Sequence, residues 1–403
     1  MKMKKTIAGA VLLSGLATPA FAGETLSAFW EEGKPILDAR LRYEYVDQQG
    51  LPEDAHATTF RARYGFETGA LYGFTFLVEG ETVIDLGLGR YNDTVNGRGN
   101  YPVVADPEDT ELNRAQVSYQ NGGVSAALGR QRIILGNGRF VGNVGWRQNE
   151  QTFDAFKLDF ESIEDLRVTY AYVDQVNRIF GDNSPNGRYD GETHLSEIAY
   201  AFSDALTAKA YGHFLSLDQA PLLSTRTIGL RLDGKTEAAG FTLKGAAEYA
   251  HQEDYDDNPL SLSLDYWHGE VKAGKDAWEV TLGGEVLEGN GTQGFSTPIA
   301  TLHKFQGFAD AFLTTPVNGI QDLYAGGSYT FGDLGPLSGI AFGATYHDFE
   351  AERGSASYGD EVDFTLNAKL PYDLSLGLKA AFFEGESGFA DRDKVWVQLA
   401  YSL

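Results

Sequence analysis

The chain has 403 residues, and its 57 acidic against 32 basic side chains give a formal net charge of −25. This charge disfavours a nucleic-acid partner, because phosphate backbones are bound by clustered lysine and arginine. The sequence contains no cysteine, which excludes a disulfide framework, so stability has to come from the fold itself.

The first 22 residues have the pattern of a secretory signal peptide. Three lysines precede a short apolar run at 6–16, and Ala20-Phe-Ala22 forms a small-residue cleavage site. The apolar run is too short to cross a bilayer as a helix, and no later segment has the apolar continuity of a membrane-spanning helix. We therefore expect cleavage after Ala22, export, and one domain over residues 23–403.

Beyond residue 35 the chain repeats a pattern in which apolar and polar residues alternate. In the run 36–46, Leu37 and Leu41 share one face of a strand, whereas Arg40 and Arg42 share the other. Runs of about ten residues have the length that a tilted strand needs to cross the membrane hydrocarbon. The alternation predicts eighteen strands, near residues 36–46, 58–67, 72–81, 111–120, 124–134, 152–161, 166–175, 194–203, 206–216, 225–234, 240–251, 262–272, 276–288, 320–331, 339–350, 361–370, 374–385 and 394–403.

The connections between these runs alternate between long and short. Segments 82–110 and 289–319 are long, whereas 121–123 and 203–205 are short. Short periplasmic turns and long extracellular loops are typical of an all-β outer-membrane protein, a transmembrane antiparallel up-and-down barrel. A soluble β-sandwich lacks this alternation of short connections at one end and long connections at the other. A barrel of about 18 strands leaves an aqueous channel rather than a packed interior.

The last strand also indicates a lipid environment. In the run 394–403, Val397, Leu399, Tyr401 and Leu403 fall on one face, with polar or small residues on the opposite face. An apolar outer face that ends in an aromatic residue and a free C-terminus resembles the closing strand of bacterial outer-membrane barrels. We expect outer-membrane lipid and lipopolysaccharide to surround the barrel.

Two segments carry a family resemblance. The first contains Leu128-Gly-Arg-Gln-Arg132, Gly138-Arg-Phe-Val-Gly142, Trp146-Arg-Gln148 and Thr152-Phe-Asp154, and the second contains Thr301-Leu-His-Lys-Phe-Gln-Gly-Phe-Ala-Asp310 and Gly319-Ile-Gln-Asp322. Together they resemble the alginate-export family of proteobacterial outer-membrane proteins over most of the barrel. The resemblance implies an 18-stranded monomeric channel with an arginine-rich lumen for a polyanionic uronate polymer.

Arginines gather on the predicted inward faces of the first strands. Neighbouring strands lie about 4.8 Å apart, so guanidinium groups on successive strands form a basic patch along one wall. The planar guanidinium fork suits carboxylates. The residues that we expect to line the pore or contact substrate are Arg40, Arg42, Arg61, Arg63, Arg114, Arg130 and Arg132, with Arg147 and Lys304 from long loops.

A second interpretation of this cluster stays open. Carboxylates on the same inner faces would pair with the arginines and turn the patch into an ion-paired ladder that braces the wall. The carboxylates in question are Asp38, Glu44, Glu67 and Glu79.

The register of the run 124–134 also leaves two options. Simple alternation from Leu128 turns Arg130 and Arg132 outward, where lipid would oppose their charge. Either this strand leaves the membrane by Gly129, or a bulge there resets the register.

We expect a passive, porin-like channel in the Gram-negative outer membrane for anionic or neutral carbohydrates and related small solutes. The alternatives are a non-conducting adhesin or structural barrel, and a specific exporter of an anionic uronate polysaccharide. No nucleophile motif accompanies the seven histidines, so we expect no enzyme and no catalytic residue. The acidic run 253–257 lacks the glycine and the spaced glutamate of a calcium loop, so we expect neither a metal nor a cofactor. We expect a monomer.

Overall fold

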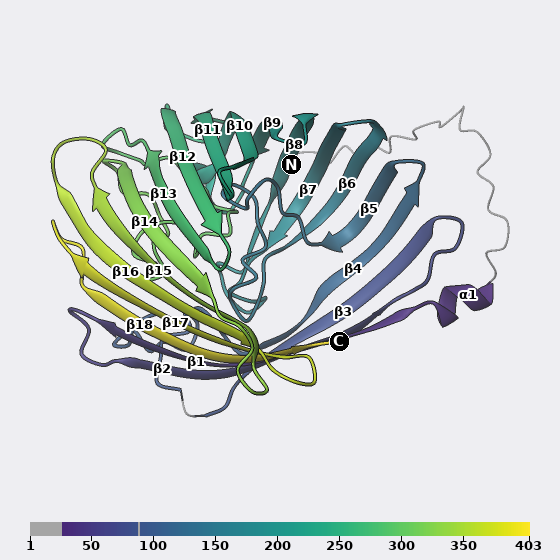
Figure 1. The fold of residues 1–403 in the computed structure, drawn as a ribbon, viewed down its shortest axis with the longest axis horizontal. Coiled ribbons are helices and arrows are strands. Elements are labelled where there is room, and N and C mark those ends of the chain that lie inside the picture. The colour runs from purple at the N-terminus through teal and green to yellow at the C-terminus, as the bar shows by residue number, and fades with distance from the viewer. Residues whose placement is uncertain (1–25, 88) are drawn as a thin grey trace, which may run out of the picture.

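The computed structural model describes residues 26–87 and 89–403, so the predicted signal peptide over residues 1–22 lies outside the described residues. A short helix, α1 (Leu26–Glu31), precedes the sheet, and one 3-10 turn, η1 (Pro221–Leu223), lies between two strands. The strands, drawn in Figure 1, are β1 (Lys34–Gln48), β2 (Ala55–Glu67), β3 (Phe74–Asp85), β4 (Asp109–Asn121), β5 (Val124–Gln131), β6 (Thr152–Ile163), β7 (Leu166–Asn177), β8 (Arg188–Ser203), β9 (Leu206–Leu215), β10 (Thr225–Ala238), β11 (Phe241–Asp254), β12 (Ser263–Lys275), β13 (Trp278–Leu287), β14 (Ile320–Thr330), β15 (Ser338–Glu350), β16 (Ser357–Lys369), β17 (Leu374–Gly385) and β18 (Arg392–Ser402).

The eighteen strands form one closed antiparallel sheet. Strands that follow one another in the chain are paired, and β1 pairs with both β2 and β18, which closes the ring. Arg42 of β1 lies opposite Thr59 of β2 and Gln398 of β18. The predicted 18-stranded up-and-down barrel is therefore confirmed. Closure pairs every strand on both sides, which is the condition for a sheet to sit in lipid.

Side chains alternate between the two faces of the barrel wall as the sequence predicts. In β1, Leu37 and Leu41 are 44% and 41% exposed on the outer face, whereas Arg42 and Glu44 are 1% and 0% exposed on the inner face. A strand presents successive side chains to opposite faces, so the apolar set faces outward along the whole strand. The outer wall is apolar and the interior is polar, which is the arrangement of a membrane barrel.

Many strand ends differ from the expected ranges by a few residues. For example, β5 ends at Gln131 rather than at residue 134, and β8 begins at Arg188 rather than at residue 194. Gly129 has a φ of 118°, a conformation that favours glycine, and the pairing of β5 with both neighbours stops within two residues of it. The pairing of β5 shows no register shift, so the bulge is not observed; the strand ends at Gln131, and Arg132 lies in the following loop. That the strand leaves the membrane by Gly129 stays a prediction.

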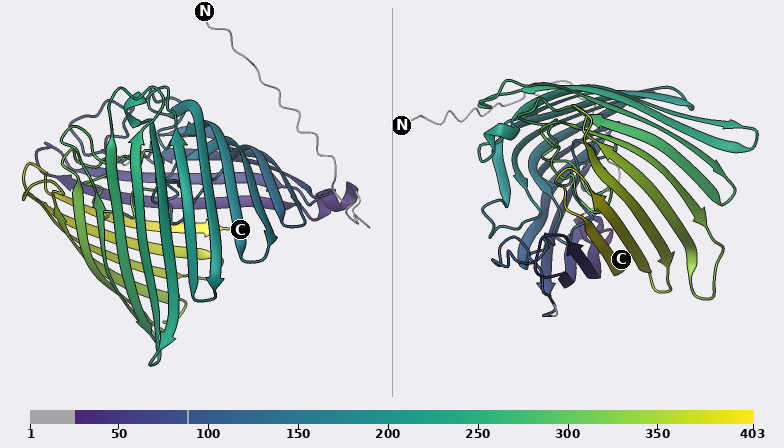
Figure 2. Two further views of the ribbon diagram at one scale, coloured as in Figure 1. Left: turned by 90° about the horizontal axis from the view of Figure 1, so that it is seen from above. Right: turned by 90° about the vertical axis from the view of Figure 1, so that its left-hand side faces the viewer.

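The connections differ between the two ends of the barrel. One end carries tight turns such as Gly122-Gly123, whose φ values of 56° and 81° suit a two-residue hairpin. The other end carries long loops, among them 86–108, 132–151 and 288–319. β1 begins and β18 ends at the short-turn end. Figures 1 and 2 show chain segments inside the ring of strands, and these come from the long loops.

The helix α1 packs against the outer side of the barrel at the short-turn end. The ring of Phe29 lies 5.9 Å from that of Phe76, and Trp30 stacks on Phe66 with their centroids 6.4 Å apart. Within residues 26–87 and 89–403, no helix is long and apolar enough to cross a membrane.

Candidate functional site

The loop 132–151 folds into the barrel and is bound there by arginines of β1. Arg40 donates hydrogen bonds to the carbonyl oxygens of Gly145 (3.2 Å), Trp146 (2.8 Å) and Arg147 (3.2 Å). Arg42 donates to the carbonyl oxygen of Trp146 (2.6 Å), and its guanidinium carbon lies 4.1 Å from the centre of the Trp146 ring. A charged donor strengthens each of these bonds, so the wall fixes the backbone of this loop.

A second loop, 288–319, meets the first one inside the barrel. The backbone nitrogen of Gly142 donates to the carbonyl oxygen of Ile299, and that of Thr301 donates to the carbonyl oxygen of Gly138, both at 2.9 Å. A Cβ on Gly142 would lie 2.0 Å from the Thr301 hydroxyl oxygen. The contact between the two loops therefore requires glycine at position 142.

The tip of the second loop is held by strands on the same side of the barrel as β1, because β18 pairs with β1 and β16 lies two strands beyond it. Phe308 and Ala309 donate their backbone N–H groups to the carboxylates of Asp363 (3.1 Å) and Glu361 (2.7 Å) on β16. Lys394 of β18 forms a 2.7 Å ion pair with Asp310. Farther round the ring, Gln252 of β11 donates to the carbonyl oxygen of Ser296 at 2.8 Å, so the two loops together span the barrel from β1 to β11 and narrow its bore.

His303 lies where the two loops meet. Its ring stacks on Trp146 at 4.6 Å and on Phe308 at 5.2 Å, and its Nδ1 lies 2.8 Å from Asp310. Burial holds the pKa of His303 well below its ordinary value. Burial opposes ionisation of Asp310 as well, but Lys394 and His303 prevail and hold its pKa well below the usual range.

Most arginines of the predicted pore-lining set are paired with carboxylates. Arg61 pairs with Asp38 and Arg63 with Glu81, while Arg63 also lies 3.6 Å from Glu150. The other pairs are Arg114–Glu79 at 2.7 Å, Arg132–Glu150 at 2.5 Å, Arg132–Glu79 at 3.4 Å, Arg42–Asp106 at 3.8 Å, and Arg147 with Glu44 at 3.0 Å, Asp310 at 3.2 Å and Asp106 at 3.7 Å.

This network corresponds to the ion-paired interpretation of the cluster, with partners that the sequence did not indicate. Asp38, Glu44 and Glu79 take part as expected, whereas Glu67 forms no ion pair within the described residues. Of the unexpected partners, Glu81 lies on β3, and Asp106, Glu150 and Asp310 come from long loops. Burial opposes the charge of Glu150, yet Arg63 and Arg132 lower its pKa to about 2. The arginines that pair with these loop carboxylates therefore bind the loops to the barrel.

Arg130 lies apart from this network. It pairs with Asp154 of β6 at 2.7 Å and donates to the carbonyl oxygen of Leu112. Its contact with a solute stays a prediction, as it does for the other expected pore-lining residues.

Arg40, Lys304 and Lys379 have no carboxylate oxygen within 4.0 Å among the described residues. The same holds for Arg178 and Arg392, which line a cavity toward the long loops and donate to backbone carbonyl oxygens. Lys304, in the second loop, donates to the carbonyl oxygen of Asn137. Its pKa lies below the ordinary value, mainly because of burial and then because of Arg231. Lys379 of β17 lies 4.0 Å from the Trp146 ring centre and 3.3 Å from that of Phe308. Lys379 is not among the residues predicted from the sequence, although alternation in the run 374–385 places it on the inner face.

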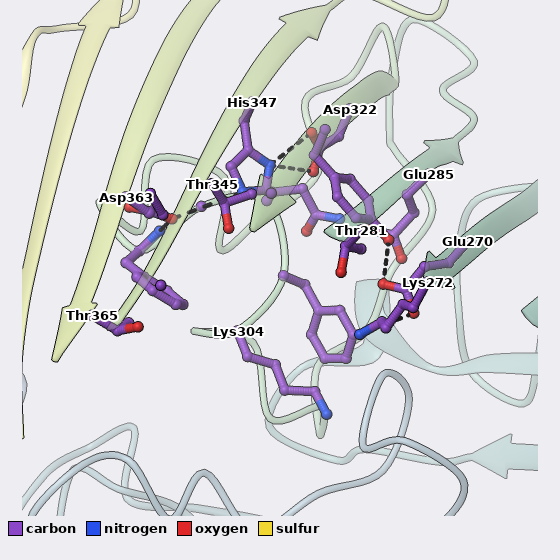
Figure 3. A pocket seen from close by; sticks show the side chains of 18 of the residues that line it. Glu270, Lys272, Thr281, Glu285, Lys304, Asp322, Thr345, His347, Asp363 and Thr365 are labelled. Carbon is purple, nitrogen blue, oxygen red and sulfur yellow. Dashed lines mark hydrogen bonds and ion pairs between the residues drawn. The ribbon is translucent and has the colours of Figure 1, made fainter. Parts of the chain in front are cut away.

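The constriction lies between two cavities. One, of about 520 Å³, extends toward the short turns and is lined by Lys304, Phe305 and inward residues of β12 to β16 (Figure 3). The other, of about 480 Å³, extends toward the long loops, where Val103, Phe180 and Arg392 line it. Among the side chains that the structure describes, no cluster of three or more His, Cys, Asp or Glu residues is arranged to hold a metal ion.

Comparison with known proteins gives matches at the level of fold. No family model matches the chain, and no curated protein matches its sequence. OpdK of Pseudomonas aeruginosa, solved with vanillate, is 16% identical with a TM-score of 0.73, and OccK9 (OpdG) of the same organism is 17% identical with a TM-score of 0.75. OccAB3 of Acinetobacter baumannii is 14% identical with a TM-score of 0.73. Each match covers 93% of this chain and 99% of the other chain. These likenesses support a porin-like barrel but give no support to the alginate-export family in particular.

Proposed function

We propose that this protein is a passive channel of the bacterial outer membrane for small anionic solutes. The observation that carries the proposal is the position of Arg40, Lys304 and Lys379 at a constriction inside a barrel with an apolar outer wall. Within the described part of the chain, these three cations have no carboxylate oxygen within 4.0 Å. We further propose that the barrel is surrounded by outer-membrane lipid and lipopolysaccharide and acts as a monomer.

Electrostatics favour anions at such a constriction. A cation whose charge is not offset nearby attracts anions, and low-dielectric walls strengthen its field. The paired arginines contribute less, because each is offset by a carboxylate within a few ångströms. Ion selectivity should therefore depend on Arg40, Lys304 and Lys379 rather than on the arginines that are paired with carboxylates.

The two inward loops favour small solutes over a polymer. They are fixed to each other and to β1, β16 and β18 by the bonds described above, so a uronate polysaccharide would have to displace them. OpdK, which shares the fold, was solved with vanillate, a small aromatic carboxylate. Polysaccharide export therefore stands second to the passage of small anions.

Planar-bilayer recordings test the proposal. The purified protein should conduct, and its reversal potential in a KCl gradient should show preference for chloride. Replacing Arg40, Lys304 and Lys379 together with methionine should move the reversal potential toward cation preference. Lys275→Met is the matched control, because Lys275 is exposed at the end of β12 with its ammonium over the Phe241 ring. Absence of any current would instead favour a non-conducting adhesin or structural barrel.

A further inference from the structure

The cavity on the short-turn side contains charged groups that are largely satisfied within the protein. Glu285 pairs with Arg139 at 2.7 Å, Asp322 with His347 at 2.9 Å, and Glu270 with Lys272 at 3.2 Å. Figure 3 shows Glu270, Glu285 and Asp322 together with Lys304, which lines the same cavity. Asp363 also lines the cavity, where it accepts from the Phe308 N–H at 3.1 Å and lies 3.8 Å from Nε2 of His347. An anion that enters this cavity therefore meets four carboxylates and, in Lys304, an ammonium group with no carboxylate oxygen within 4.0 Å among the described residues.

A row of hydroxyl groups forms the wall opposite this loop. Thr281, Ser328, Thr345 and Thr365 come from four successive strands, β13 to β16, and all line the cavity. Within the part of the chain that the structure describes, the hydroxyls of Thr281, Thr345 and Thr365 make no hydrogen bond. Each hydroxyl is both a donor and an acceptor, so the row offers a solute several polar contacts.

Two glycines keep these hydroxyls accessible. A Cβ on Gly326 would lie 2.8 Å from the Thr345 hydroxyl oxygen, and a Cβ on Gly343 would lie 2.8 Å from that of Thr365. Any larger residue would cover the hydroxyl beside it. Phe305 and Phe308 line the same cavity from the loop and add an apolar surface next to the polar row.

We propose that this cavity is a binding site for polyhydroxylated monocarboxylates, of which a hexuronate monomer is an example. The carboxylate would bind the ammonium of Lys304, and the sugar hydroxyls would bind the threonine row. The cavity volume of about 520 Å³ lies within the range of small-molecule sites. The inference deepens the proposed function and rests on it, since the cavity adjoins the constriction.

The hydroxyl row also explains which solutes are bound less well. An aromatic acid of the same charge reaches Lys304 but leaves threonine hydroxyls without a partner when it displaces water from them, which costs free energy. A neutral sugar satisfies the hydroxyls but gains no charge-assisted bond from Lys304. A solute with both features gains both contributions.

Isothermal titration calorimetry of the detergent-solubilised protein tests the site without relying on conductance. Glucuronate should bind about tenfold more tightly than either glucose or benzoate. Relative to glucose it gains one charge-assisted hydrogen bond, and relative to benzoate it gains several neutral hydrogen bonds. Lys304→Gln should weaken glucuronate binding about tenfold. The double variant Thr345→Val and Thr365→Val should weaken glucuronate by a similar factor. It should strengthen benzoate, which then leaves no threonine hydroxyl without a partner.

Control variants remove the same groups elsewhere. Lys275→Gln removes an exposed ammonium on β12, and Thr330→Val removes a hydroxyl at the end of β14 that does not line the cavity. Circular dichroism should be used to check that each variant retains its β structure. Equal affinity for the three solutes, or unchanged glucuronate affinity in Lys304→Gln, would overturn the site. A barrel that binds glucuronate but carries no current would overturn the proposed function and leave the site standing.

Discussion

Lys379 of β17 donates a 2.8 Å hydrogen bond to Nε2 of His303, a residue 76 positions earlier in the chain. An ammonium group only donates, so Nε2 must carry a lone pair, and the ring proton must sit on Nδ1, facing Asp310. His303 is therefore a neutral imidazole that joins a wall cation to a loop carboxylate. This arrangement links the position of both loops to the protonation of one ring.

The first prediction is that acid loosens the constriction. Because the pKa of His303 lies well below its ordinary value of about 6.5, the undocked loop binds more protons than the docked loop once the pH falls below that value. The free energy of docking should therefore decrease as the pH falls from about 6.5 toward the lowered pKa. The depressed pKa of Asp310 adds a loss of the same sign below about 3.9.

The charged groups around His303 are two that contact its ring and two that pair with Asp310. Asp310 and Lys379 contact its two nitrogens, and Arg147 and Lys394 both pair with Asp310. Single-channel recordings at falling pH should show a rise in conductance or in current noise. In His303→Gln, whose amide does not titrate, this rise should be much smaller. Identical pH profiles in both proteins would assign the effect to other groups.

The second prediction separates two arginines of the wall. Arg63 is buried against Glu81 and Glu150. Arg63→Met leaves the buried Glu81 unpaired, whereas Glu150 keeps Arg132, and it should lower the free energy of unfolding by about 3–5 kcal/mol. Arg40 binds backbone carbonyl oxygens, so Arg40→Met should chiefly shift the reversal potential toward cations. Urea unfolding and bilayer recordings of both variants measure the two effects. The opposite pattern would show that Arg63 carries the selectivity.

The strands were predictable because each one is a local pattern. Alternation placed Leu41 outside and Arg42 inside from neighbouring residues alone, and the same reading identified eighteen strands. The contacts of the site were harder to predict from the sequence, because they join positions that lie far apart in the chain. Arg139 binds Glu285 across 146 residues and Arg147 binds Asp310 across 163 residues, and no local periodicity indicates such pairs.

The third prediction concerns the contact between the two loops. A side chain at position 142 meets both the hydroxyl and the backbone nitrogen of Thr301, so Gly142→Ala should push the loops apart and increase single-channel conductance. Gly99→Ala is the matched control, since Gly99 lies in the loop 86–108 with open space around its Cβ position and an ordinary φ. Equal conductance in both variants would mean that the contact does not set the width of the bore.

The last prediction is that Arg147 is the residue that holds the constriction in place. Its guanidinium contacts Glu44 of β1, Asp106 of the loop 86–108 and Asp310 of the loop 288–319, so one side chain joins three segments. Arg147→Met removes these contacts and leaves buried carboxylates together, at a cost of about 3–5 kcal/mol.

The barrel should survive this change, because its strand pairing does not involve Arg147. We therefore expect Arg147→Met to keep its β-sheet circular dichroism while its single-channel conductance rises and becomes noisy. Arg188→Met is a suitable control, because Arg188 is exposed in β8 and pairs only with Asp190 among the described residues. A variant with unchanged current would show that the remaining bonds of Arg40, Arg42 and Lys394 are enough to hold the loops.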